Sequence, residues 1–361
     1  PDYQAQFTLP QDSGPNGIPD MIFRAATEQV LPPRLVDFFI VAGLPGDAPI
    51  WIDAPTEDVP LGELPLEKVY FRPSILDTFP DQISVADTLL PEHIGKFAFP
   101  SGLSGRIVSA EDANAQETQM ELQPTMSSFV LTDVNSVRLY AVCLCIMEEV
   151  DLEKFAASIQ IPLDPELRAH SDQKELRKSI SSKLLALHEE NSSSLHRTAG
   201  SSSYSARHTL LLPKALVLVS HYPFFDLFRS FISHLYRVSL SNSPLPIERY
   251  IANFVREVPL PPRGQIEVRV NLPDKVLVAQ RSAKNALPSL GFSLRPLFSL
   301  LSLENIIAVF ECLLVEAKVA LISSKYSLLT PVASGLLALL FPFEWQGAFI
   351  PIMPATMIDV L

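Results

Sequence analysis

Prolines divide this sequence into short apolar runs, and that division sets the size of the elements it can form. The chain has 361 residues, with 32 prolines and 13 glycines. Proline lacks a backbone N–H donor and has a fixed φ angle, so it ends helices and strands. The pattern predicts a globular chain of short buried elements, and it excludes collagen-like repeats and a polyproline stalk.

Composition and length agree with a packed protein. Apolar residues make up 47% of the chain and charged residues 19%. A disordered chain is poor in apolar residues and rich in charge, so most of this sequence must fold. At roughly 100–200 residues per domain, the length predicts two domains or one large domain.

The charge is unevenly distributed. Residues 1–150 hold 22 acidic and 7 basic side chains, whereas residues 151–361 hold 18 acidic and 21 basic ones. An acidic half repels phosphates, so we expect no nucleic acid as a partner and no direct binding of anionic lipid by that half. A basic protein partner is compatible with this charge.

Motifs that carry chemistry are absent from the sequence. It contains no GxGxxG after a strand, no complete P-loop at Gly95-Lys96, no GxSxG and no HExxH. The three cysteines, Cys143, Cys145 and Cys312, support neither a disulfide framework nor a zinc site. His221 follows an apolar strand, and we interpret it as a strand-end residue, not as a base. We therefore predict no catalytic residue, no metal and no cofactor.

The first 160 residues contain several short candidate elements. We interpret residues 1–33 as a leader or tail and Arg34–Gly43 as a first strand. Val69–Arg72 and Lys96–Pro100 fit short strands, with a helical turn or loop at 87–95. The polar, acidic stretch Ser104–Ser128 is interpreted as a loop insertion.

A hairpin is the clearest signal in this half. Two runs rich in β-branched and apolar residues, 128–132 and 137–146, flank the Asp/Asn turn at 133–136. The second run is apolar on both faces, which predicts a central strand.

A polar segment separates the two halves. Asp172–Glu190 fits a helix with Leu176, Ile180, Leu184 and Leu187 on one stripe. The serine-rich stretch Asn191–His208 follows, and we predict that it is a disordered linker.

From residue 210, apolar strands alternate with helices. This alternation favours a parallel or mostly parallel sheet covered on both faces. The expected strands are 215–220, 265–270, 275–279, 319–323 and 348–352, and the expected helices begin at Pro223, Pro246, Ser302 and Leu328. Pro331 fits the last helix only if it lies in the first turn. Prolines and polar residues within 328–353 argue against a membrane span there.

Three separated blocks resemble the DENN domain family. Residues 297–361, with ECLLVEAKVALIS and LLFPFEWQGAFIPIMP, resemble the central DENN module. The runs LVDFFIVA (35–42) and FVLTDVNSVRLYAVCLC (129–145) resemble the upstream module. PKALVLVSHY (213–222) resembles the start of the central one.

The resemblance implies an α/β fold in two lobes. The N-lobe is expected to be longin-like, an antiparallel sheet with helices, and the C-lobe to be the α/β central DENN module, truncated at its C-terminus. The corresponding divisions are 1–33 leader, 34–160 upstream module, 161–209 helical and Ser-rich linker, and 210–361 incomplete central module.

The resemblance also implies a function: guanine nucleotide exchange on a Rab-type small GTPase in vesicle trafficking, without covalent chemistry. The alternative is a DENN-like scaffold or heterodimer partner without exchange activity, and an unrelated α/β enzyme is the third reading. We expect a cytoplasmic protein that reaches vesicle or endosomal membranes only through its partner or through regions outside this chain.

In the family the GTPase lies across the two lobes, so candidate contact residues must stand at element ends. In the N-lobe we select Asp133 and Asn135 in the hairpin turn and Arg138 beside it. In the C-lobe we select Glu316, Lys318 and Trp345. Each has a structural alternative, because turn residues can only shape the turn, exposed charges can be solvated and Trp345 can pack beneath the sheet.

Overall fold

The computed structural model describes residues 33–360 with internal gaps. The gaps are 47–49, 54–65, 82–92, 110–111, 113–114, 116–117, 120–121, 133–136, 162–170, 198–207, 242, 244, 284–286 and 288–289. The leader expected at 1–33 therefore lies outside the described residues, apart from Pro33. The described residues from Arg34 onward belong to one compact unit, Arg34–Leu361.

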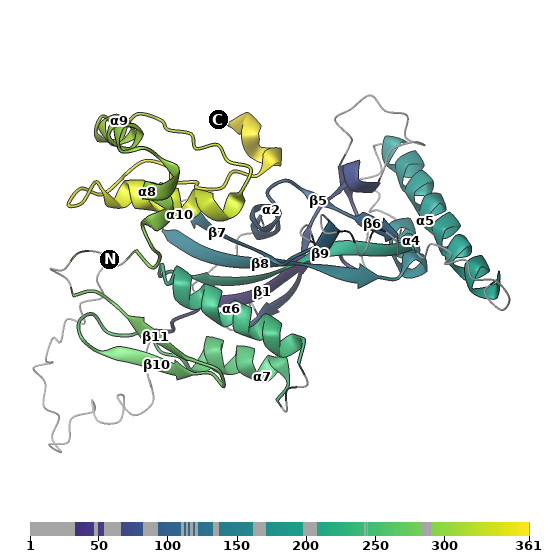
Figure 1. Ribbon diagram of the computed structural model, residues 1–361, viewed down its shortest axis with the longest axis horizontal. Helices are drawn as coiled ribbons and strands as arrows, with labels where there is room; N and C mark the ends of the chain where they lie inside the picture. Colours follow the sequence, from purple (N-terminus) through teal and green to yellow (C-terminus); the bar gives the residue numbers. More distant parts are fainter. Residues whose placement is uncertain are drawn as a thin grey trace, which may run out of the picture. The chain divides into compact units, whose positions relative to one another are not determined.

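A six-stranded antiparallel sheet is the centre of this unit (Figure 1). Its strand order is β4–β1–β9–β8–β7, and β6 also pairs with β9. The bounds are β1 Phe38–Gly43, β4 Ser74–Phe79, β6 Arg106–Ser109, β7 Thr125–Thr132, β8 Arg138–Val150 and β9 His208–Ser220. A small sheet of β2 (Ile52–Asp53), β3 (Tyr70–Phe71) and β5 (Leu103–Ser104) lies beside it in the strand order β2–β3–β5.

The expected hairpin is confirmed. Strands β7 and β8 pair antiparallel from Thr132↔Arg138 to Thr125↔Cys145. Strand β8 is an interior strand, because β7 pairs on one side of it and β9 on the other.

Strand β9 gives the sheet its connectivity. Its second half pairs with β1, from Ala42↔Ala215 to Phe38↔Val219, and its first half pairs with β6. The segment 215–220 is thus a strand as expected. It inserts antiparallel between β1 and β8, however, and does not open a separate parallel sheet. The expected module boundary at 209/210 falls inside β9, which completes a sheet built mainly from earlier residues. This boundary stays a prediction.

Both faces of the sheet are covered. On one face, alternate strand residues such as Ile40, Ala141 and Val217 pack in a core with α2 (Ile94–Ala98), α4 (Leu152–Gln160) and α5 (Ser171–Arg197). On the other, Phe39, Val142 and Leu218 pack against α6 (Phe225–Ser239) and the π-helical turn η5 (Asn253–Glu257). The helix α7 (Ile247–Ala252) leads into η5.

The strands expected at 265–270 and 275–279 are present as β10 (Glu267–Asn271) and β11 (Val276–Gln280), but they form a separate two-stranded antiparallel sheet and not part of a parallel one. Its inward residues, including Leu277 and Ala279, join the core around α6.

Three C-terminal helices form a third core. They are α8 (Arg295–Leu300), α9 (Leu303–Leu314) and α10 (Tyr326–Ala338), with a 3₁₀ segment η6 at Ala355–Val360. Their shared buried residues include Leu297, Ile306 and Leu336. The Ser302 hydroxyl accepts a hydrogen bond from the Asn305 N–H and caps α9, which confirms the helix start expected at Ser302.

The prediction of a parallel sheet in the C-terminal half is wrong for the described residues. Residues 319–323 and 348–352 are not strands, and Ile322 is 98% exposed. A strand needs a paired neighbour to satisfy its backbone groups, and neither run has one here. The fold class is therefore mixed α/β around an antiparallel sheet, with the longin-like and DENN parts.

Other local expectations also changed. Residues 94–98 form helix α2, not part of a strand, because Ile94, Phe97 and Ala98 share one buried helical side. The expected loop 104–128 contains β6 and the start of β7. Helix α5 continues through Asn191–Arg197, so the linker expected at 191–208 is helical in its first part, and residues 198–207 lie outside the described ones.

Two details concern the apolar segment 328–353. Pro331 is the sixth residue of α10, beyond the first turn where we expected it. Among the described residues, no helix is both long enough and apolar enough to cross a membrane.

Candidate functional site

The structure brings two of the six predicted site residues together. Arg138 begins β8, at the end of the β7–β8 hairpin, and its Nη2 donates a hydrogen bond to the Trp345 carbonyl oxygen at 3.0 Å. Its guanidinium carbon lies 5.7 Å from the ring centre of Phe349. Residues 207 positions apart in the sequence thus meet where the C-terminal segment passes the hairpin. Asp133 and Asn135 lie outside the described residues.

Trp345 belongs to a compact turn. Its ring is half-buried against the core of α8–α10, and its Nε1 donates to the Ala348 carbonyl at 3.2 Å. A Cβ atom at Gly347 would lie 3.1 Å from three ring atoms of Trp345. Glycine therefore lets the backbone turn close against the indole and places Phe349 over Arg138.

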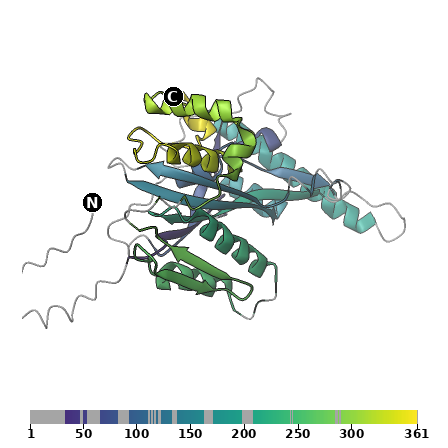
Figure 2. The ribbon, with the colours of Figure 1, turned by 60° about the vertical axis from the view of Figure 1, so that its left-hand side comes forward.

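The C-terminal helices are fixed to the sheet at the same edge. Strand β7 is the last strand of the sheet, and α10 lies along it (Figure 2). The buried Thr330 hydroxyl donates to the Ser128 carbonyl of β7. Further along, the Ala355 N–H donates to the Pro100 carbonyl at 2.8 Å. These contacts hold the segment between α10 and η6 in one position relative to the hairpin.

Glu316 and Lys318 lie in the turn after α9. The Glu316 N–H donates to Leu313 and the Ala317 N–H donates to Cys312, which is the Schellman arrangement that ends a helix. Glu316 has φ 57°, a left-handed conformation usually taken by glycine. Glu316 and Lys318 are exposed. In the described part of the chain, no hydrogen bond or ion pair joins this turn to Arg138 or Trp345.

Exposed aromatic residues beside Trp345 extend the site. Phe341 is 51% exposed and Phe343 is 70% exposed, and both precede Trp345 in the sequence FPFEW. Val137, next to Arg138, is 42% exposed. Only Trp345 was predicted from this stretch, and Phe343 and Phe349 were not. The clustering of three aromatic residues around Pro342 was the available signal for Phe343.

This arrangement suits recognition more than chemistry. It contains the hydrogen-bonded guanidinium of Arg138, exposed aromatic side chains, and the solvent-exposed charges of Glu316 and Lys318 in the turn after α9. The combination resembles the apolar anchors and polar rim of protein interfaces.

One group of metal-ligating side chains lies elsewhere in the described residues. Single ligand atoms of Asp151, Glu153 and His188 lie within 4.8 Å of one another. Asp151 and Glu153 are exposed, and Asp151 caps α4 through hydrogen bonds from the Glu153 and Lys154 N–H groups. We assign no ion to it, because an exposed acidic cluster at a helix start is fully explained by capping.

Comparison with known proteins agrees with this architecture. The family model of the uDENN domain matches residues 73–146, and that of the DENN (AEX-3) domain matches residues 211–361. A DENN domain-containing protein of Schizosaccharomyces pombe is 27% identical over an alignment of 359 residues, which covers 82% of this chain. The chain spans 36% of that relative's length. With both modules matched in order and over more than half of its residues, this chain belongs to the DENN domain family.

Proposed function

We propose that this chain is a guanine nucleotide exchange factor for a Rab-type small GTPase in vesicle trafficking. DENN domains generally serve this role, and the two matched modules are the basis for the proposal. The GTPase would bring the protein to vesicle or endosomal membranes from the cytoplasm.

The observation that carries the proposal is the contact between Arg138 and Trp345. It places the end of the β7–β8 hairpin beside the FPFEW segment, so residues of both modules border one surface. Phe343 supplies an exposed aromatic anchor there. Apolar anchors surrounded by polar groups provide most of the affinity of protein interfaces.

The turn after α9, which contains Glu316, is a second candidate region for contact with the GTPase. A non-glycine residue in the left-handed region costs roughly 1–2 kcal/mol, and such strain concentrates at functional positions. The φ of 57° at Glu316 is a reason to keep it and the nearby Lys318 among the candidates.

Exchange requires no bond to form or break. The factor binds the GTPase more tightly in a conformation whose switch regions hold nucleotide poorly, and this differential affinity shifts the population toward release. The residues proposed here would act by binding and orienting the switch regions, and none would transfer a proton.

Release of a fluorescent GDP analogue from a panel of Rab proteins tests the proposal. We expect one or a few to release GDP faster with this chain. Phe343→Ser and Lys318→Glu should slow that release about tenfold, since losing an interface anchor costs one or two kcal/mol. Lys178→Glu is the matched control, because it reverses an exposed lysine on α5.

A second candidate function is a DENN-like scaffold or heterodimer partner without exchange activity. The observation in its favour is that Arg138 already donates one hydrogen bond to the Trp345 carbonyl, so part of its guanidinium holds the two modules together. A scaffold would bind a Rab protein in pull-down assays without accelerating release. If neither binding nor release is found across the panel, the exchange proposal is wrong.

A further inference from the structure

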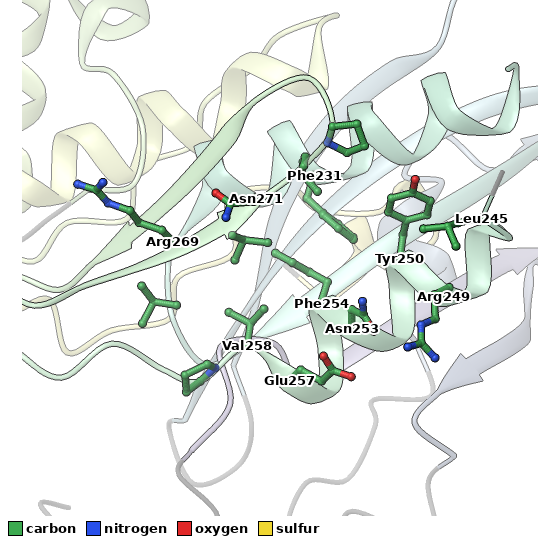
Figure 3. Close-up of a pocket in the computed structure, with 15 residues that line it drawn as sticks. Phe231, Leu245, Arg249, Tyr250, Asn253, Phe254, Glu257, Val258, Arg269 and Asn271 are labelled. Atoms are coloured by element: carbon green, nitrogen blue, oxygen red, sulfur yellow. The ribbon is translucent and has the colours of Figure 1, made fainter. Parts of the chain in front are cut away.

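A groove lies between strand β10 and the helix formed by α7 and η5 (Figure 3). Its volume is about 600 Å³. Arg249, Asn253 and Glu257 line the helical wall, spaced four residues apart. Between the walls lie Phe231 and Phe254, whose rings stack at 3.7 Å. The floor is thus apolar, and the helical wall carries polar side chains.

The other wall is the free edge of β10. Every residue from Val268 to Pro273 lines the groove, whereas no residue of β11 does. Side chains on alternate positions point to opposite faces of a strand. A run of consecutive lining residues therefore means that the groove follows the backbone edge, not one face of the hairpin.

The register shows which backbone groups point to that edge. The Leu272 N–H donates to the Lys275 carbonyl, so these two residues form a hydrogen-bonded pair. Such pairs alternate along an antiparallel ladder with pairs whose N–H and C=O groups point outward. Counting back from Leu272, the outward positions are Asn271, Arg269 and Glu267, opposite Val276, Val278 and Gln280. In the described structure β10 pairs only with β11.

Backbone pairing with an extended segment already occurs at one end of the groove. Val258 and Pro259 line it there. Pro259 forms an antiparallel bridge with Arg34, and the Leu35 N–H donates to the Val258 carbonyl at 3.1 Å. The surface is thus shaped to hold extended chain beside it.

Charge indicates what kind of segment fits. Residues 225–281 hold eight basic and five acidic side chains, in a chain whose net charge is −12. Two of the groove's charged residues are Arg249 and Arg269, against one carboxylate, Glu257. Arg269 also forms an ion pair with Glu267 at 3.1 Å, whereas Arg249 forms none with the residues that the structure describes.

We propose that this groove binds an extended, acidic segment of a partner protein, which adds as a strand to the open edge of β10. Its backbone would pair with the outward groups of Arg269 and Asn271. Alternate apolar side chains would contact the Phe231–Phe254 floor, and acidic ones would face Arg249 and Arg269. This is the general mode of recognition by strand addition.

A short fluorescein-labelled peptide that alternates glutamate and valine is the probe, and fluorescence anisotropy with the full chain is the measurement. We expect it to bind about tenfold more tightly than the lysine–valine peptide, since opposite charges across an interface favour the right partner by one or two kcal/mol. Arg249→Glu should reverse that preference without affecting the β10 edge.

A proline substitution tests the backbone pairing itself. Asn271→Pro removes an outward N–H and leaves the β10–β11 ladder intact, so binding should weaken about tenfold through the lost hydrogen bond. Val278→Pro is the matched control, because it removes an outward N–H from β11, on the other edge. It should change binding by no more than about twofold.

Three results would overturn the proposal: no binding of either peptide, equal loss in both proline variants, or a preference that survives Arg249→Glu. If Asn271→Pro instead abolishes a concentration-dependent dimer in sedimentation experiments, a second copy of this chain occupies the edge and the peptide assignment is wrong. None of these outcomes depends on GDP release, so failure here is separable from failure of the proposed exchange activity.

Discussion

The His221–Asp37 pair joins the end of β9 to the start of β1. Oδ2 of Asp37 accepts a hydrogen bond from the His221 backbone N–H and lies 2.8 Å from Nδ1 of its ring. The hydrogen bond to Asp37 raises the pKa of His221 above its ordinary value, and partial burial opposes that rise. His221, predicted as a strand-end residue, therefore forms a structural ion pair with Asp37.

The raised pKa predicts a pH-dependent stability. A group whose pKa is higher in the folded state stabilises that state fully below its unfolded pKa, about 6.5 for histidine, and the contribution disappears as pH rises through the folded value. The loss of unfolding free energy in His221→Gln, measured by urea denaturation, should thus be larger at mildly acid than at alkaline pH. In an Asp37→Asn background the difference should not change with pH, and a constant difference in the wild-type background would contradict the assignment.

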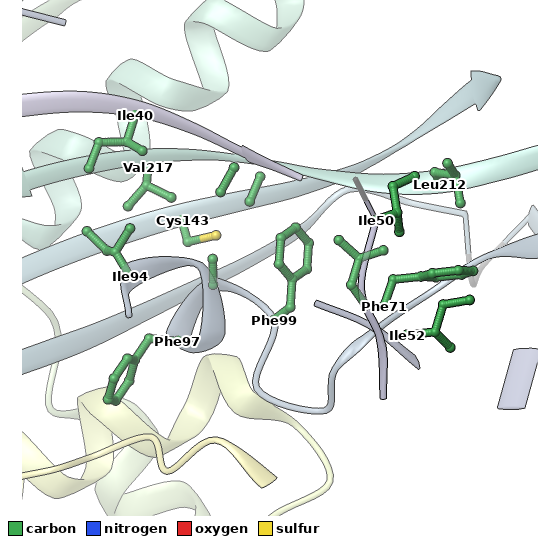
Figure 4. Packing of buried hydrophobic residues seen from close by; sticks show 14 of the residues in the cluster. Ile40, Ile50, Ile52, Phe71, Ile94, Phe97, Phe99, Cys143, Leu212 and Val217 are labelled. Atoms are coloured by element: carbon green, nitrogen blue, oxygen red, sulfur yellow. The ribbon is translucent and has the colours of Figure 1, made fainter. Parts of the chain in front are cut away.

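The cysteines differ in accessibility. Cys143 is fully buried on β8, paired with Val217 of β9, which in turn pairs with Ile40 of β1 (Figure 4). Burial raises the pKa of the Cys143 thiol strongly and that of the Cys145 thiol to about 11. Cys312 is exposed on α9.

We expect Ellman's reagent to react quickly with one thiol of the native protein, because the thiolate is the reactive form and must be reached by the reagent. Cys312→Ser should remove the fast phase, and the other two thiols should appear only on unfolding. A second fast thiol would show that the sheet opens around Cys145.

Among the elements, α10 protects the edge of the main sheet. Strand β7 is the last in the strand order, and a free edge is a site for unwanted pairing. The Thr330 hydroxyl satisfies the Ser128 carbonyl of that strand and is itself completely buried. The helix therefore replaces a missing neighbouring strand at this point.

Thr330→Val should lower the free energy of unfolding by about 1–3 kcal/mol, because it keeps the shape but removes the donor to a buried carbonyl. Thr330→Ser is the control: it keeps the hydroxyl and loses only a methyl group, worth about 1 kcal/mol. Chemical denaturation measures both. If the serine variant is the less stable of the two, the hydrogen bond is not what holds the helix.

At the scale of the molecule, β9 unites the two halves of the chain. It comes after the α5 helix yet lies between β1 and β8, which precede that helix. Without β9 these two strands would lose their shared neighbour, and the core residues Val217 and Val219 would be missing. The matched uDENN region cannot complete this sheet by itself.

A fragment of residues 34–160 should therefore show no cooperative unfolding transition. A fragment of residues 34–281 should unfold cooperatively. The larger fragment contains β9 together with α6 and β10–β11, which cover the second face. Circular dichroism during urea titration distinguishes the two cases. Cooperative unfolding of the shorter fragment would mean that the sheet can close without β9.

The sequence by itself determined the elements that depend on interactions between residues close together in the chain. The β7–β8 hairpin and the helices α5, α6 and α9 were predicted correctly, because side-chain period and caps act over neighbouring residues. Family membership followed from motifs in order along the chain.

Only the tertiary structure decided the partners of these elements. An apolar run must be buried, but its composition does not say which neighbour buries it. The place of β9 between β1 and β8, the helical form of 94–98 and the unpaired state of 319–323 all depend on contacts between distant residues. The same holds for the site: Arg138 and Trp345 could each be selected from the sequence, whereas the hydrogen bond that joins them exists because α10 docks on β7.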